Sequence, residues 1–157
     1  MSIRDAAPAD TSDLLRLIRE LAGYEREPDA VEATEADLRR HLFDPGPKVF
    51  ALVAEVDGSV VGMAIYFVSF STWTGRHGLY LEDLFVEPAH RSHGIGRALM
   101  RALARRAVDR GYKRLEWAVL DWNQPAIDFY RALGAVPMAE WTTFRLDGEA
   151  LARVAQG

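Results

Sequence analysis

The order of patterns between Leu79 and Leu120 constrains the fold of this chain more than any other feature. A β-rich run from Leu79 to Val86 precedes a glycine-containing turn, a helical run from Gly96 to Arg110, and a second β-rich run from Leu115 to Leu120. A strand, a helix and a strand in this order form a βαβ unit, whose two strands lie parallel. The segment predicts an α/β protein.

The segments before and after this unit predict an antiparallel part of the sheet. Val49–Val56 and Val60–Phe70 are joined by Asp57-Gly58, a dipeptide that tolerates the positive φ angles of a type I′ hairpin turn. We expect an antiparallel pair there, a short strand around Ile3, and a last strand over about Trp141–Leu146. The predicted fold class is therefore α/β with a mostly antiparallel sheet.

Helical spacing of apolar side chains indicates three more helices, from Asp10 to about Gly23, from Thr34 to Leu42 and from Asn123 to Gly134. Thr34 with Asp37 three residues later forms a capping-box pattern. The loop 24–29 between the first two helices is too polar for the core, as functional loops often are. No repeat or linker divides the 157 residues, so we expect one domain over residues 1–157.

Composition removes several classes of protein. The chain has no cysteine and a net charge of −4, which excludes disulfide scaffolds and thiolate metal sites and gives no general attraction to nucleic acid or anionic membranes. The longest apolar run, Val60–Val68, falls short of the about 20 residues that a spanning helix needs. Met1–Asp10 lacks the features of a signal peptide, so we expect a cytoplasmic protein. The histidines show no ligand spacing, so we expect no metal.

A short turn, Arg91-Ser92-His93-Gly94-Ile95-Gly96, lies between the predicted strand and helix of the βαβ unit. The first backbone N–H groups of a helix are unpaired and attract anions. Gly94 and Gly96 let a phosphate approach the main chain, and Arg91 can add a charge-assisted hydrogen bond. Neither the dinucleotide fingerprint nor the P-loop pattern is complete here. The turn predicts a pyrophosphate site, and glycine recruited only for turn geometry is the alternative.

A second pattern, Asn123-x-Pro125-Ala126-Ile127-x-Phe129-Tyr130, follows the next predicted strand. Preceded by Leu84-Phe85-Val86 and Arg91-x-x-Gly94-x-Gly96, it resembles the GNAT superfamily of acetyl-CoA-dependent N-acetyltransferases. Further segments narrow the resemblance to the spermidine/spermine N1-acetyltransferase branch, which includes thialysine acetyltransferases: Leu21-Ala22-x-Tyr24-Glu25, Tyr80-Leu81-Glu82-Asp83 and Trp141. The similarity covers most of the chain.

The resemblance implies a GNAT fold, a mixed and strongly twisted sheet whose fourth and fifth strands splay apart between flanking helices. The pantetheine arm of acetyl-CoA would lie in the gap, against main-chain groups of Leu84 and Val86. The turn residues would hold the pyrophosphate: Arg91, Ser92, Gly94, Ile95, Gly96 and Arg97. Asn123 would also bind the pantetheine. An ordinary helix N-cap is its alternative role, and the two are compatible because backbone and side chain act separately.

Acetyl transfer to an amine requires a neutral nucleophile. A primary amine with a pKa of about 10.4 is neutral in only about one molecule in 2,500 at pH 7, which costs about 4.6 kcal/mol. Glu82 is the candidate proton acceptor because it lies on the strand beside the expected thioester. Asp83 and Glu25 are further candidate carboxylates for a substrate with several ammonium groups. In a regular strand Glu82 and Asp83 would face opposite sides, so only a bulge or a long substrate lets both contact one ligand.

Tyr130 is the candidate general acid for the departing thiolate of coenzyme A, because a tyrosine hydroxyl is protonated at neutral pH. A helix tyrosine packed beside Phe129 is the alternative. Tyr24 and Trp141 could form walls of the amine site by cation–π contact, or could belong to the core.

These inferences predict a single-domain enzyme that transfers an acetyl group from acetyl-CoA directly to a primary amine of a small basic metabolite, such as a diamine, a polyamine or a thialysine-like amino acid. The resemblance also implies a homodimer. Two alternatives stay open. One is a protein lysine or N-terminal acetyltransferase, and the other is a coenzyme A-binding regulatory module without catalysis.

Overall fold

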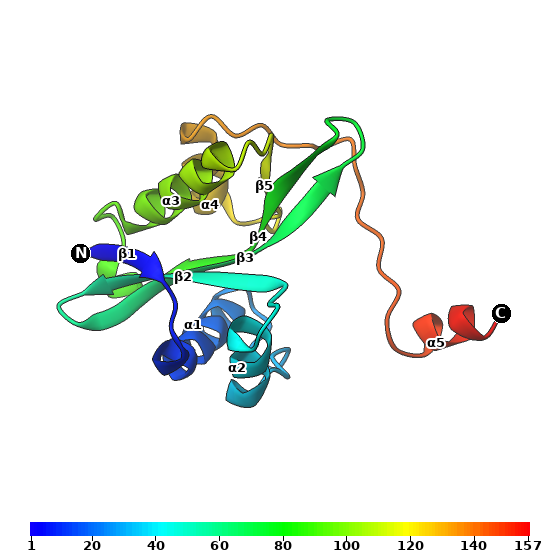
Figure 1. The fold of residues 1–157 in the computed structure, drawn as a ribbon, viewed down its shortest axis with the longest axis horizontal. Helices are drawn as coiled ribbons and strands as arrows, with labels where there is room; N and C mark the ends of the chain where they lie inside the picture. The colour runs from blue at the N-terminus through cyan, green and yellow to red at the C-terminus, as the bar shows by residue number, and fades with distance from the viewer. The chain divides into compact units, whose positions relative to one another are not determined.

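The computed structural model describes every residue from Met1 to Gly157, in two compact units, Met1–Leu120 and Asp121–Gly157. The first unit contains one sheet, in the order β1 (Ser2–Asp5), β2 (Val49–Val56), β3 (Ser59–Ser71), β4 (Arg76–Val86) and β5 (Leu115–Trp117) (Figure 1). Neighbouring strands are antiparallel except β4 and β5, which are parallel. The mixed, mostly antiparallel sheet and the βαβ unit are thus confirmed.

Helices cover both faces of this sheet. Figure 1 shows α1 (Thr11–Tyr24) and α2 (Glu35–Phe43) on one face and α3 (Ile95–Asp109) on the other. The core under α1 and α2 is built from apolar side chains of both helices and of β2, β3 and β4, namely Leu14, Leu17, Leu42, Ala51, Val53, Val60, Met63, Ile65 and Phe85. Residues 60–66 of β3 are apolar at every position, as is typical of a strand buried on both faces. The helices on the two sides of the sheet cover both faces.

Local signals in the sequence explain most element boundaries. Asp57 and Gly58 have φ angles of 49° and 80°, so the hairpin turn has the positive φ angles of type I′. At the start of α2 the Asp37 amide donates to the Thr34 hydroxyl at 3.2 Å and the Thr34 amide to the Asp37 carboxylate at 2.9 Å, which completes the capping box. Gly111, with φ 71°, follows the end of α3.

Asp10 does not cap the first helix, although the sequence indicates it as the residue at which that helix begins. Its carboxylate makes no cap hydrogen bond to α1, which begins after the short 3₁₀ turn Pro8–Asp10. It accepts instead from the Ala7 amide at 2.7 Å and from two nitrogens of Arg4 at 2.8 and 3.0 Å. The hydrogen bonds from Arg4 lower the pKa of Asp10. A strong cation from β1 therefore competes successfully for the capping carboxylate.

The second unit contains two helices and no strand. In α4 (Gln124–Ala132) the Asn123 side chain caps the Ala126 amide at 3.4 Å, as predicted, and Gly134 follows with φ 90°. The strand expected over Trp141–Leu146 is wrong, because these residues have no regular secondary structure. A strand needs a hydrogen-bonded neighbour, and residues 121–157 offer none. The sequence analysis also did not predict α5 (Gly148–Gln156).

No helix in this structure has both the length and the apolar character required to cross a membrane.

Candidate active site

The strand β4 has a closed half and an open half. Its residues Leu79–Leu81 pair with Leu115–Trp117 of β5, and β5 then ends, although the sequence predicted a strand to Leu120. The following residues, Glu82 to Val86, have β3 on one side and no strand on the other. We call residues 82–86 the open half of β4. This edge arises because β5 ends at Trp117, and an edge offers unpaired main-chain groups to a ligand. The splay of the fourth and fifth strands that the resemblance implies stays a prediction.

A β-bulge places Glu82 outside the regular ladder. Ile65 of β3 pairs with Asp83, but the next β3 residue, Tyr66, pairs with Leu81. Residues directly opposite each other share a face of the sheet, and Ile65 belongs to the core under α1 and α2. Asp83 therefore lies on the α1 side, and Glu82 is the extra residue beside it. The condition under which both carboxylates can serve one ligand is met by the bulge.

Three carboxylates gather at this place. Burial, then the charge of Glu82, then the charge of Glu25 raise the pKa of Asp83 to about 6. Burial also raises the pKa of Glu25, the residue that follows the last turn of α1. The charges of Glu82 and Glu25 act on Asp83 because both carboxylates lie near it. The structure thus brings Glu25, Glu82 and Asp83 into one acidic cluster, which a cationic ligand would stabilise.

The turn after β4 has the backbone shape expected of an anion site. Ser92 and Gly94 have φ angles of 65° and 79°, and left-handed residues of this kind direct successive N–H groups into one concavity. Gly94 is the N-cap of α3 and provides no side chain for the first amides of that helix, which begin at Ile95. A Cβ built at Gly94 would meet nothing within 4 Å. These features fit a bound diphosphate, with Gly96 and Arg97 in the first helical turn.

Arg91 adopts a position that the sequence did not indicate. Its Nε donates to the Val86 carbonyl at 2.9 Å, so the main-chain group expected to meet pantetheine is engaged by Arg91 in this structure. Its Cζ lies 5.2 Å from the ring centroid of Tyr24 and 5.2 Å from that of Phe85. Arg91 therefore connects the turn, the open half of β4 and the end of α1. Leu84 pairs with Ala64 of β3 on that same half.

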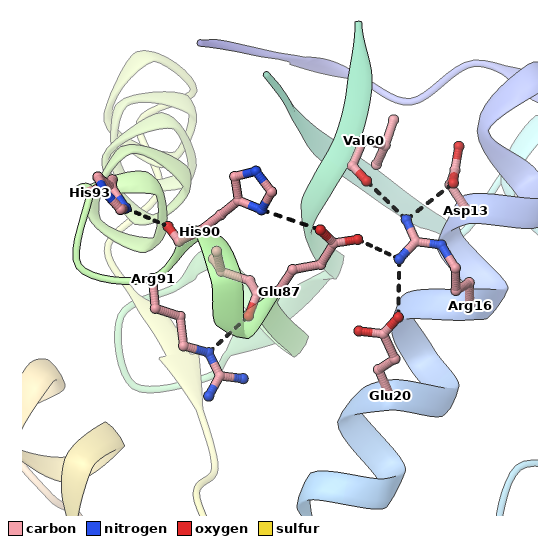
Figure 2. Close-up of polar contacts among 9 residues, drawn as sticks. Asp13, Arg16, Glu20, Val60, Glu87, His90, Arg91 and His93 are labelled. Atoms are coloured by element: carbon pink, nitrogen blue, oxygen red, sulfur yellow. Dashed lines mark hydrogen bonds and ion pairs between the residues drawn. The ribbon is translucent and has the colours of Figure 1, made fainter. Parts of the chain in front are cut away.

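An ion-pair network anchors the turn from its other side. Figure 2 shows Arg16 of α1 between Asp13, Glu20 and Glu87, and a nitrogen of Arg16 donates to the Val60 carbonyl at 2.9 Å. Glu87, the first residue after β4, also lies 3.3 Å from Nδ1 of His90. The sequence analysis missed this network, because a helix pattern reveals only the pairs of Arg16 with Asp13 and Glu20 and not its long-range partner Glu87.

The remaining predicted site residues belong to the second unit. Asn123 directly precedes α4, and Tyr130 lies in the last turn of this helix. The ring centroids of Tyr130 and Phe129 are 5.4 Å apart. Trp141 lies in the segment without regular structure, where its amide donates to the Met138 carbonyl at 3.2 Å. Their roles stay predictions.

A cavity of about 540 Å³ lies away from the acidic cluster and includes none of the predicted site residues. Its lining includes Asp13, Arg16, Asp57, Glu87 and His90. Within this lining Arg16 pairs with both Asp13 and Glu87. The structure groups no three His, Asp or Glu side chains in a way that could hold a metal ion.

Comparisons with known proteins agree with this geometry. Residues 12–135 match the Acetyltransferase (GNAT) family. A thialysine N-epsilon-acetyltransferase of Bos taurus is 43% identical over 98% of this chain and 96% of its own length. A spermidine/spermine N(1)-acetyltransferase-like protein of Homo sapiens is 36% identical over 95% of this chain and 23% of its own length.

Among solved structures, an integron cassette protein from the mobile metagenome of V. cholerae is 30% identical, with a TM-score of 0.83 over 99% of this chain and 98% of that protein. The family match extends from α1 to the end of α4 and thus includes the open half of β4, the turn 91–96 and the capped helix α4. The chain therefore belongs to the acetyltransferase (GNAT) family and is an acetyltransferase that uses the family's co-substrate, acetyl-CoA.

Proposed function

We propose that this enzyme acetylates a primary amine of a small molecule that carries more than one charged group, such as a diamine, a polyamine or a thialysine-like amino acid. The observation that carries the proposal is the acidic cluster of Glu25, Glu82 and Asp83 beside the open half of β4. The relatives named for thialysine and for spermidine or spermine support the same class of acceptor.

In this proposal acetyl-CoA lies along the open half of β4. It supplies a thioester, whose acetyl group passes to the amine. Main-chain groups of Leu84 and Val86 hold the pantetheine, and the amides of residues 92–97 hold the diphosphate. The edge without a strand partner and the left-handed turn fit these groups. Asn123 contributes from the start of α4, where its side chain already caps the helix and its main chain can bind the pantetheine.

The carboxylates prepare the amine. An ammonium group that enters the cluster is attracted by Asp83 and Glu25, and Glu82 on the bulge accepts its proton directly or through a water molecule. A buried carboxyl with a raised pKa gains most from a cationic partner, because the partner favours the ionised form. The acidic cluster thus binds the substrate as an ammonium and lets it react as a neutral amine.

Tyr130 donates a proton to the departing thiolate in this proposal, and Tyr24 and Trp141 flank the amine. The neutral amine attacks the thioester directly, so that no covalent enzyme intermediate is needed. The chain has no cysteine to form one.

A free-thiol release assay with acetyl-CoA across a panel of amines tests the proposal. The panel contains thialysine, lysine, ornithine, putrescine, spermidine, spermine, and a peptide with one lysine. We expect turnover with at least one small diamine or amino acid and a kcat/KM at least about tenfold lower with the peptide, a difference of about 1.4 kcal/mol in transition-state stabilisation. Preference for the peptide would instead identify a protein acetyltransferase. Binding of coenzyme A without turnover of any amine would identify a regulatory module.

A further inference from the structure

Glu87 lies at the junction between the open half of β4 and the turn expected to hold the diphosphate. Its amide donates to the Val61 carbonyl at 2.9 Å, and its carbonyl accepts from the His90 amide at 2.9 Å. Figure 2 shows its carboxylate between two side chains: Oε1 accepts from Arg16, and Oε2 lies 3.3 Å from Nδ1 of His90. This one residue therefore connects β3, α1 and the beginning of the turn.

The α1 end of this connection is fixed. Leu14 and Leu17, which flank Arg16 in the helix, have no exposed surface, and closely packed core side chains leave a helix little room to shift. Arg16 donates to four acceptors, the Val60 carbonyl and the carboxylates of Asp13, Glu20 and Glu87. The Glu87 carboxylate is thus held by a guanidinium that is itself held from several sides.

The turn, in contrast, needs support from outside. Ser92 has a φ of 65°, and a residue with a Cβ keeps this left-handed conformation only where the surrounding structure fixes it. Nδ1 of His93 lies 3.4 Å from the His90 carbonyl oxygen. Nδ1 of His90 is buried and makes no regular hydrogen bond, and the Glu87 carboxylate is the polar partner beside it. Removing that carboxylate therefore frees His90 and, with it, the beginning of the turn.

We propose that Glu87 is a positioning residue for acetyl-CoA. Its carboxylate, held by Arg16, keeps the turn 91–96 in the shape that binds the diphosphate. Glu87 acts through His90 and not by contact with the co-substrate. A turn that has its bound shape before the ligand arrives binds more tightly, because the ligand does not have to order it. The inference rests on the proposed function, which places the diphosphate at this turn.

Charge alone predicts the opposite effect of removing this carboxylate. A negative charge near an anion site repels the ligand, so Glu87→Gln would bind coenzyme A more tightly if Glu87 acted only by its charge. If Glu87 positions the turn, the same substitution weakens binding, because only a fraction of the molecules then has a competent turn. The direction of the change separates the two roles.

Calorimetry with coenzyme A and steady-state kinetics with acetyl-CoA test the proposal on the full chain. Glu87→Gln should raise the Kd of coenzyme A about tenfold, as expected if about one molecule in ten has a competent turn. Because the reacting atoms lie elsewhere, kcat at saturating acetyl-CoA should change by less than about twofold. 3′-Phospho-ADP, which has the diphosphate but no pantetheine arm, should lose affinity by the same factor as coenzyme A.

Glu20→Gln is the matched control. Glu20 accepts from the same Arg16 at 3.0 Å but makes no polar contact with the turn, so this variant should change the Kd of coenzyme A by less than about twofold.

Arg16→Met breaks the connection from the α1 side and is the second variant if Glu87→Gln does not fold. The double variant Arg16→Met/Glu87→Gln should bind coenzyme A about as weakly as the weaker single variant, because both changes break one connection. If charge alone were responsible, adding Glu87→Gln to Arg16→Met would instead restore affinity.

Two results would overturn the proposal while leaving the proposed function intact. One is equal or tighter binding of coenzyme A by Glu87→Gln. The other is an equal loss of affinity in Glu87→Gln and Glu20→Gln, which would mean that the network stabilises α1 and does not position the turn. Failure of the proposed function is a separate outcome, because the wild-type protein would then not bind coenzyme A, not bind 3′-phospho-ADP, or acetylate no amine.

Discussion

The two halves of β4 belong to one strand but have different roles. In the closed half, Leu79–Leu81 are paired on both sides and Gly78 lies so close to β5 that a Cβ would stand 2.8 Å from the Arg114 carbonyl. In the open half, one side of the strand is unpaired and two consecutive acidic residues lie at a bulge. The closed half stabilises the sheet, and the open half presents groups that an uninterrupted sheet would bury.

The largest expected effect on kcat concerns Tyr130, the proposed general acid, which lies outside the open half of β4. Tyr130→Phe should lower kcat about a thousandfold, within the usual range for general acid–base groups, and change acetyl-CoA affinity by less than about threefold. Steady-state kinetics and calorimetry measure the two quantities. Tyr112→Phe, which alters a tyrosine of the first unit, is the control and should leave both unchanged. An unaltered kcat in Tyr130→Phe would remove the general-acid assignment.

Glu82→Gln tests whether the bulge in the open half holds the proton acceptor. We expect kcat to fall about a hundredfold, because the amide cannot accept the amine proton, and the pH–rate profile to shift. Glu116→Gln makes the same chemical change opposite Tyr80 in the closed half and should change kcat by less than about twofold. If the two variants behave alike, the contrast between the halves has no catalytic meaning.

Asp83→Asn tests whether the ionised carboxylate of Asp83 in the open half lowers the stability of the folded protein. The pKa of Asp83 rises from 3.8 to about 6 on folding, so the folded state binds its proton more tightly, and stability falls as the pH rises between these values. Above pH 7 the variant should be more stable than the wild type by about 2 kcal/mol, less than the full shift implies because solvent reaches this half-buried carboxyl. Below about pH 4 the Asp83 carboxyl of the wild type is neutral, like the amide of the variant, so the difference in stability between the two proteins should vanish.

Urea unfolding at a series of pH values measures this difference. A variant that is no more stable at pH 8 than the wild type would show that the carboxylate is adequately solvated in the folded protein.

Gly78→Ala tests the closed half. The added methyl group must displace the Arg114 carbonyl or the Ser69 side chain, at 2.8 and 3.1 Å from its position, and we expect a loss of about 1.5 kcal/mol of stability. Gly23→Ala in α1, where a Cβ meets nothing within 4 Å, should instead gain about 0.5 kcal/mol. Thermal unfolding of both variants measures the difference, and an equal response would mean that the β4–β5 contact adapts freely.

Local signals predicted much of this fold. The type I′ turn at Asp57-Gly58, the capping box at Thr34 and the Asn123 cap depend on side chains within a few residues, and all three form as expected. The strand predicted over Trp141–Leu146 failed because the residues of a segment show only that it can pair. Whether it pairs depends on a neighbouring strand, which no local pattern reveals.

The candidate site was predictable in part for the same reason. The motifs indicated Glu82, Asp83 and the turn from Arg91 to Gly96, because these residues lie close together along the chain. The contact of Arg91 with Tyr24 joins residues 67 positions apart, and the network of Arg16 and Glu87 joins residues 71 apart. Only the packing of α1 against β4 brings these pairs together, so tertiary structure is needed to see them.

Glu82 is a supernumerary residue, since the ladder is in register on both sides of it. Leu81 already faces Tyr66 and Asp83 already faces Ile65, so removing Glu82 from the chain would leave every other pair matched. A deletion inside a strand usually inverts all side chains beyond it, but here it would abolish one carboxylate and spare the architecture. The proposed base thus lies on an inserted residue, and its loss or replacement would leave the strand pairing of the sheet unchanged.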